Sequence, residues 1–272
     1  MARLDDYLDR LLSRGRYHFS RDEAFASSGL TPAALSAALA RATKRRRVLS
    51  PRHGFYIILR PEDWVAGAPD PVRWIDALMR HQRLAYRISL LRAAAFHGAS
   101  HQASMVFQVI VPRQLRPIEI GRHRLQFVFQ SPAVFAKTNR PEWLGRIKSD
   151  AGFATVAGVE LTLFDSTRYL RKSSGLSGVA QIVLDIGAQA KPRILRALAP
   201  HHEGATVRRL GYLLDQLGHA RQARALEGFV QDQKNFVPLN PGQVAAWRRG
   251  ARAPKVDARW KIVVNDAVEV AR

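Results

Sequence analysis

The chain has 272 residues, a length that indicates about two domains of ordinary size. Hydrophobic residues make up 47% of the sequence and charged residues 24%, a composition that excludes a chain disordered throughout. Cysteine is absent, so disulfides, zinc–thiolate sites and thiol catalysis are excluded. No apolar run is long enough to cross a membrane, and no secretory signal pattern is found. We therefore expect a cytoplasmic protein that makes no contact with a membrane.

The charge balance is strongly basic. Lysine and arginine number 43 against 22 acidic residues, for a formal net charge of +21. Such a field attracts polyanions, with nucleic acid the first candidate partner and an acidic membrane surface the second. Basic residues are densest within the first 60 residues, where Arg41 and residues 44–47 form a cluster without an acidic neighbour.

The first predicted elements are two helices separated by a short strand. Residues 4–14 repeat leucine at helical spacing, and Gly15 follows as a stop. Residues 17–19 are apolar and predict an edge strand. Ser20 and Glu23 match a capping box, so we expect a second helix over residues 21–27.

A third helix and a hairpin complete this region. Thr31 as N-cap and Pro32 at the first helical position predict a helix over residues 32–45. Aromatic and β-branched residues on both sides of a Pro/Gly turn at residues 50–54 predict a hairpin. This order of elements predicts a winged helix-turn-helix over residues 1–60, whose 32–45 helix enters the major groove of DNA.

The rest of the chain predicts a larger domain of mixed type. Residues 61–70 are rich in proline and are interpreted as a linker. Residues 71–272 are expected to form a larger C-terminal domain that mixes strands and helices, so the predicted fold class is α+β. Strands are predicted at 105–111, 124–129, 153–162 and 260–264, and helices at 71–81, 90–98 (with Ser89 as cap), 163–172, 176–190, 192–199, 205–218 and 220–232.

The basic helix and hairpin supply the candidate DNA-binding residues. Hydroxyl groups near the start of the 32–45 helix can hydrogen-bond to base edges or phosphates. Basic side chains near the end of that helix can bind phosphates, and the tip of the hairpin can contact the adjacent DNA backbone. The plainer interpretation is a solvated basic helix end that complements the helix dipole. The candidate residues, in those three groups, are Thr31 and Ser36, then Arg41, Lys44, Arg45 and Arg46, then Arg52 and His53.

Other motifs are better explained structurally. His97 and His101 have the spacing of a metalloprotease motif but lack the glutamate between them. His202 lies between His201 and Glu203, and consecutive side chains on a helix do not face one another, so they are poorly placed to bind one metal ion. Residues 172–178 do not match a P-loop, and Asp165 has no paired acid nearby. We therefore expect no catalytic residues, no metal site and no cofactor, and the protein is predicted not to be an enzyme.

Five short segments follow one another in an order found in one known family. They are His97-Gly98 with Ser100-His101-Gln102, then residues 108–112, 161–165, 175–179 and 209–214. This ordered set resembles the AbiEi family, which comprises antitoxins and transcriptional regulators of abortive-infection toxin–antitoxin systems in phage defence. The resemblance extends from the predicted winged helix to about residue 232.

The resemblance implies two activities. The N-terminal winged helix-turn-helix would bind inverted repeats in the promoter of its own operon and act as a repressor. The C-terminal domain would counteract a cognate AbiEii-type toxin, a nucleotidyltransferase, and would support self-association on double-stranded operator DNA. The family is not enzymatic.

Two alternative functions stay open at this point. One is a ligand-responsive transcription factor without a toxin partner, which an enclosed apolar pocket would favour. The other is a nucleic-acid-processing enzyme, which is disfavoured because the acidic residues of the C-terminal region are scattered. The basic segment from Arg248 to Lys261 is either a second nucleic-acid contact or a solvated tail.

Overall fold

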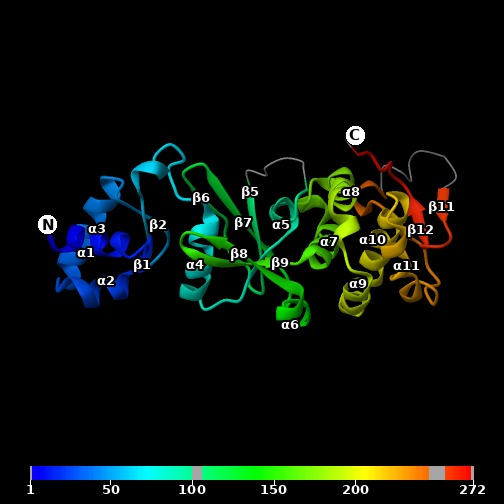
Figure 1. Cartoon of the computed structure of the whole chain (residues 1–272), viewed down its shortest axis with the longest axis horizontal. Coiled ribbons are helices and arrows are strands. Elements are labelled where there is room, and N and C mark those ends of the chain that lie inside the picture. The colour runs from blue at the N-terminus through cyan, green and yellow to red at the C-terminus, as the bar shows by residue number, and fades with distance from the viewer. Residues whose placement is uncertain (1, 100–105, 245–254, 271–272) are drawn as a thin grey trace. The chain divides into compact units, whose positions relative to one another are not determined.

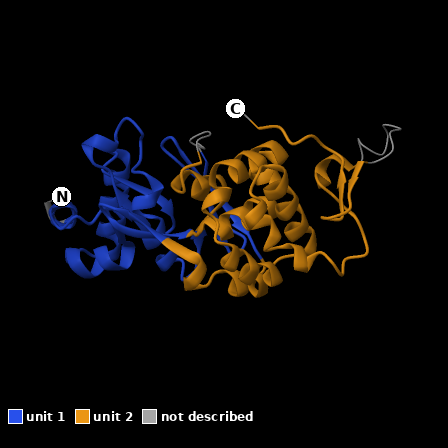
Figure 2. Ribbon diagram, turned by 45° about the vertical axis from the view of Figure 1, so that its right-hand side comes forward, with its two compact units in different colours: residues 1–87, 105–130, 146–156 blue, residues 88–104, 131–145, 157–272 orange. Residues whose placement is uncertain are grey.

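The structure is a computed structural model that describes residues 2–99, 106–244 and 255–270. The chain divides into two compact units, coloured blue and orange in Figure 2. Unit 1 comprises residues 1–87, 105–130 and 146–156, and unit 2 comprises residues 88–104, 131–145 and 157–272. Both units contain helices and sheet strands, so the predicted mixed α+β class is confirmed.

Three helices open unit 1: α1 (Ala2–Ser13), α2 (Arg21–Ser28) and α3 (Pro32–Lys44), labelled in Figure 1. The predicted capping box is present, because Ser20 accepts from the Glu23 amide while Glu23 accepts from the Ser20 amide. Gly29 ends α2 in the left-handed conformation at φ 61°. Each helix buries one apolar stripe, and these stripes share a core with the adjacent strands.

Strands β1 (His18–Ser20), β2 (Val48–Arg52) and β3 (Phe55–Ile58) form a three-stranded sheet beside these helices. The strand order is β1-β3-β2 and both pairings are antiparallel. The register shifts between Leu49 and Arg52, where Pro51 has no amide hydrogen to donate. Phe19 and Leu35 lie fully buried in the core between sheet and helices.

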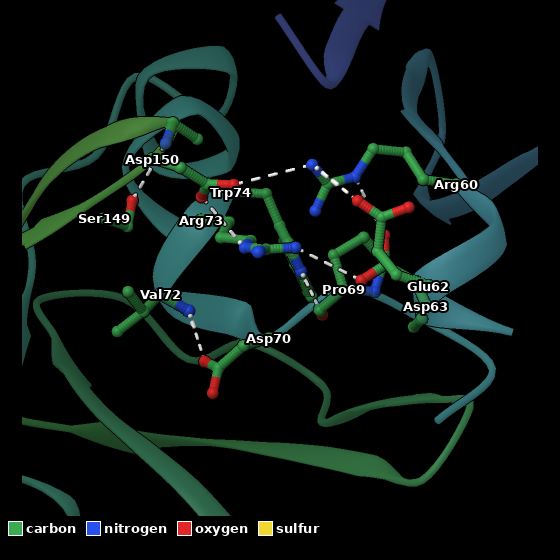
Figure 3. Close-up of polar contacts among 12 residues, drawn as sticks. Arg60, Glu62, Asp63, Pro69, Asp70, Val72, Arg73, Trp74, Ser149 and Asp150 are labelled. Carbon is green, nitrogen blue, oxygen red and sulfur yellow. Dashed lines mark hydrogen bonds and ion pairs between the residues drawn. The ribbon is translucent and has the colours of Figure 1, made fainter. Parts of the chain in front are cut away.

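The segment expected as a linker is folded. It contains the single 3₁₀ turns η1 (Pro61–Asp63) and η2 (Pro71–Arg73), and Asp70 caps the second by accepting from the Val72 amide at 2.9 Å. Buried Asp63 accepts from Arg60 Nε at 3.3 Å and from Arg73 Nη1 at 3.2 Å (Figure 3). The predicted domain boundary at residues 61–70 stays a prediction.

A six-stranded sheet, most of whose residues belong to unit 1, follows α4 (Ile75–His81). Its order is β6-β7-β5-β4-β9-β8, with β5 and β7 parallel and β6 and β7 antiparallel. Val109 and Ile110 are consecutive and both buried, as expected where both faces of a strand are covered, and this explains the continuous apolar run at 105–111 that predicts a strand. The strands are β4 (Arg87–Ile88), β5 (Val106–Val111), β6 (Ile118–Ile120), β7 (His123–Phe129), β8 (Leu144–Ser149) and β9 (Gly152–Ala157).

Unit 2 is mainly helical. Helix α7 contacts α5, α8, α9 and α10, and its residues from Glu160 to Thr167 are all buried. A helix buried on every side explains why this run carries no amphipathic pattern. The helices are α5 (Leu90–Phe96), α6 (Pro132–Thr138), α7 (Val159–Arg168), α8 (Gly175–Ile186), α9 (Pro192–Leu198), α10 (Gly204–Gln216) and α11 (Ala220–Arg224).

A small sheet lies on α10. Its order is β10-β12-β11, from β10 (Val237–Pro238), β11 (Lys255–Asp257) and β12 (Ile262–Val264). Trp260 is fully buried, and its indole N–H donates to Asp215 at 3.2 Å. The predicted final strand at 260–264 is therefore present, although it starts two residues later.

Several local predictions were wrong. The strand predicted over 153–162 ends at Ala157, and the helix α7 begins at Val159 instead of 163. Ser89 does not cap α5; its hydroxyl donates to Asp165 Oδ2 at 2.8 Å. The predicted helix over 220–232 is α11 followed by a 3₁₀ turn, and α6 and strands β4, β6 and β8 were not predicted.

Candidate nucleic-acid interface

Helix α3 presents a solvent-facing side made of small residues. Thr31 caps the helix by accepting from the Ala34 amide at 3.3 Å. Leu35, Ala38, Leu39 and Ala42 point into the core, so Ala33, Ser36, Ala37 and Ala40 are left exposed. Small exposed side chains allow the helix backbone to approach another surface closely.

The basic cluster lies at the C-terminal end of this helix. Arg41, Lys44, Arg45 and Arg46 are all exposed. Arg45 pairs with Asp5 at 3.5 Å, and the neighbouring Arg47 pairs with Asp9 at 2.9 Å. Among the residues that the structure describes, no carboxylate pairs with Arg41, Lys44 or Arg46, so these three cations are available to an external anion.

A hollow of about 530 Å³ lies along α3 between the helix and strands β2 and β3. Ser36, Thr43 and Lys44 line it from the helix, and Ser50 and Tyr56 line it from the strands. The hollow places hydroxyl groups and a cation around one concave surface. Such groups can donate to phosphates and to base edges.

Arg21 also lines this hollow, although it is not among the DNA-binding residues predicted from the sequence. Its Nη2 donates to Ser36 Oγ at 2.6 Å, while Ser36 Oγ donates to the Pro32 carbonyl at 2.8 Å. The guanidinium therefore lies beside a residue predicted to contact DNA. The sequence feature that could have identified Arg21 is its position directly after the N-cap Ser20, at the start of a helix that packs on α3.

Both predicted wing-tip residues, Arg52 and His53, contact other parts of unit 1. Arg52 donates to the Arg116 carbonyl, and its guanidinium lies 5.7 Å from the Phe127 ring centroid. Burial, and secondarily the Arg116 charge, lowers the pKa of Arg52 from its usual range. The His53 carbonyl contacts His81 Nε2 at 3.2 Å, whereas the His53 side chain is exposed.

The other polar motifs have structural partners. His97 Nε2 lies 2.7 Å from the Ala157 carbonyl, while His101 lies outside the described residues. Of the basic segment from Arg248 to Lys261, Arg259 pairs with Asp215 at 2.7 Å and also with Glu227. Across residues 2–99, 106–244 and 255–270, no group of three or more histidine and acidic side chains is arranged to hold a metal ion.

No helix within the described parts of the chain combines the length and apolar composition that crossing a bilayer requires.

Residues 87–216 match a family model described as the AbiEi antitoxin C-terminal domain. The chain is therefore of the antitoxin class, a component of toxin–antitoxin systems. Over these residues the match supports an AbiEi family antitoxin, in agreement with the resemblance noted in the sequence. That family consists of antitoxins and is not a family of enzymes. No curated protein matches the chain at a significant level.

The fold as a whole is similar to a solved structure. The crystal structure of RV2827C protein from Mycobacterium tuberculosis superposes with a TM-score of 0.63 at 14% sequence identity. The similarity covers 97% of this chain and 91% of that chain. The likeness therefore includes the first 60 residues, and at this identity it concerns the fold alone.

Proposed function

We propose that this antitoxin binds the promoter DNA of its own operon and represses it. In this proposal residues 1–60 form a winged helix-turn-helix, and α3 is the helix that enters the major groove. The observation that supports it most is the exposed side of α3, where small residues lead to the cations Arg41, Lys44 and Arg46. A net charge of +21 adds a long-range attraction to DNA.

The proposed DNA contacts are those predicted from the sequence, together with Arg21. Ser36 and Lys44 line the hollow beside α3, so they suit direct contact. Arg52 is held by the Arg116 carbonyl, so its contact with DNA would need that hydrogen bond to open. His53, with an exposed side chain, is the better candidate of the two at the β2–β3 turn.

The C-terminal domain is proposed to counteract the toxin. The family match supports an antitoxin role, and the AbiEii-type nucleotidyltransferase is the partner that the family suggests. We propose that residues 71–272 carry this activity and hold neighbouring copies together on the operator. A cytoplasmic location and the absence of catalysis belong to the same proposal.

A second candidate function is a transcription factor that senses a small anion. A hollow of about 390 Å³ in unit 1 is lined by His18, Asp76 and three arginines, Arg73, Arg80 and Arg146. Its volume lies in the range of small-molecule sites, but its lining is polar where most such sites are apolar. Release from DNA that depends on a small anion would favour this candidate over the first.

The test is fluorescence anisotropy of the full chain on labelled DNA from upstream of its own gene, across a salt series. If the protein neutralises roughly six to eight phosphates, the log–log salt slope should be about −5 to −7. Arg41→Gln combined with Lys44→Gln should weaken binding and make the slope less negative by about two. Equal affinity for unrelated DNA of the same length would contradict an operator-specific repressor.

A further inference from the structure

Two large apolar side chains lie exposed at the tip of the loop that follows η1. Trp64 is 65% exposed and Val65 is 76% exposed. The other tryptophans that the structure describes, Trp74, Trp143 and Trp260, are at most 8% exposed. Among the described residues these are the two most exposed large hydrophobic side chains, and an exposed apolar patch can mark an interaction site.

The loop that carries this tip is held rigidly. A Cβ on Gly121 would lie 2.4 Å from the Ala66 carbonyl oxygen, so the two backbones meet at a distance that only glycine permits. The Arg122 amide donates to the same carbonyl at 2.7 Å. The Gly67 amide donates to the carbonyl of buried Asp63 at 2.8 Å. The exposed Trp64 therefore projects from an ordered support, and its contact with a partner costs little loop entropy.

The surroundings of the tip are basic. Trp64 lines a hollow of about 550 Å³ together with Arg45 and Arg46 from the end of α3. The remaining lining residues are Leu49, Leu59, Gly67 and Gly121, so the only charges that line it are positive. Arg46 has a left-handed backbone at φ 55°, which turns the chain at the end of α3. An apolar ring beside guanidinium groups matches the sugar edges and phosphates of DNA.

We propose that Trp64, Val65 and Arg46 form a second DNA contact beside α3. Arg46 binds a phosphate, and the Trp64 indole packs against the sugar and base edges of the minor groove that flanks the α3 site. A two-fold contact between copies of this chain would instead bring the arginines of both copies together, which like-charge repulsion disfavours. This inference rests on the proposed DNA-binding function and adds Trp64 and Val65, which lie outside the predicted helix-turn-helix, to the proposed contact of Arg46.

The experiment compares full-length variants on one operator duplex, by anisotropy and by hydroxyl-radical footprinting. Trp64→Ala should weaken binding by about tenfold and leave the salt slope unchanged, because an apolar contact releases no counterions. It should also remove protection from the flanking minor groove while protection at the centre remains. Arg46→Gln should make the salt slope less negative by about one.

Phe153→Ala is the matched control. Phe153 is 46% exposed, and the Arg146 guanidinium lies 4.4 Å from its ring centroid, so it is another exposed aromatic beside an arginine in unit 1. It should bind DNA as the wild type does. Gly121→Ala should reproduce the Trp64→Ala footprint, because the added Cβ displaces the loop and leaves the indole chemically intact.

The inference is overturned if Trp64→Ala retains wild-type affinity and footprint while Arg41→Gln with Lys44→Gln loses binding. It is also overturned if Trp64→Ala abolishes self-association in sedimentation without DNA and leaves the footprint of bound protein intact, since the tip then contacts a second copy. If the wild-type chain protects no operator DNA, the proposed function fails, and this inference fails with it. The three failures give different data, so they can be told apart.

Discussion

Arg73 Nε lies 2.9 Å from Asp150 Oδ1, and this ion pair joins the segment after β3 to the turn between β8 and β9 (Figure 3). The pair is part of a larger network, because Arg73 and Arg60 both contact Asp63, and Arg60 Nη1 lies 3.6 Å from Asp150 Oδ2. Arg60 also lies 4.2 Å from the Tyr17 ring centroid. A segment expected to be a linker is thus fixed at several points within unit 1.

The first prediction concerns the buried member of this network. Asp63 is 7% exposed, so Asp63→Ala removes the buried one of the two carboxylates that Arg60 and Arg73 share and should destabilise the protein by about 3 kcal/mol. Glu62→Ala, the control, removes a carboxylate that also pairs with Arg60 but lies in solvent, and should cost less than about 1 kcal/mol. Urea unfolding measures both, and equal losses would contradict a structural role for Asp63.

The second prediction concerns the packing of the small C-terminal sheet. A Cβ on Gly211 in α10 would lie 2.0 Å from Trp260 Cζ3. Trp260 is fully buried and cannot move aside, so Gly211→Ala should cost about 3 kcal/mol through overpacking. At Gly228 an added Cβ meets nothing within 4 Å, so Gly228→Ala is the matched control. Thermal unfolding with equal melting temperatures for the two variants would show that α10 does not need this glycine.

The third prediction concerns pH. Burial, and secondarily the Arg16 charge, lowers the pKa of His18 from 6.5 to about 4. The unfolded chain therefore takes up a proton at His18 below pH 6.5, whereas the folded chain does not, so stability falls as the pH falls towards 4. The loss should approach at most about 1.4 kcal/mol per pH unit within that window.

His18→Gln removes the titrating group and should flatten this part of the stability curve. His53→Gln, which replaces an exposed histidine, should leave the curve unchanged. Urea midpoints measured between pH 7 and 4 decide the matter. An identical slope in wild type and His18→Gln would mean that His18 is protonated in the folded chain as readily as in the unfolded one.

The fourth prediction separates the two proposed activities. Arg45→Ala with Arg46→Ala should reduce operator affinity by at least about tenfold, because two phosphate contacts are removed. The same variant should still rescue cells that express the toxin, because both residues lie outside the matched antitoxin domain at residues 87–216. Arg193→Ala with Arg196→Ala removes the same charge from exposed positions of α9 and should retain operator binding. Loss of rescue with intact DNA binding would refute the separation.

Local sequence signals predicted the first 60 residues well. The capping box at Ser20 and Glu23, the N-cap Thr31 and the turn before Phe55 each act within a few residues, so they can be recognised without the tertiary structure. The exposed cations Arg41 and Lys44 follow from the same reasoning, because the apolar stripe of α3 determines which side faces solvent. Their role in DNA binding stays a prediction.

Long-range contacts explain what the sequence analysis missed. Ser89 has the residue type of a cap, but its hydroxyl donates a hydrogen bond to Asp165, which lies far along the chain. Helix α7 is buried on all sides, so its sequence lacks the hydrophobic period by which a helix or a strand is recognised. Arg52 lies at a predicted wing tip, yet the carbonyl of Arg116 binds it.

The charge of the molecule, the helices and hairpin of its first 60 residues and the motifs of its antitoxin domain can be predicted from the order of the amino acids. Which of the charged side chains lie outside an ion pair depends on the fold. Asp5, Asp9 and Asp150 pair with particular arginines that lie far from them in the sequence, whereas Arg46 and the neighbouring Trp64 face solvent. The physical reason is that an ion pair depends on distance in space, which for residues far apart in the chain is set by packing.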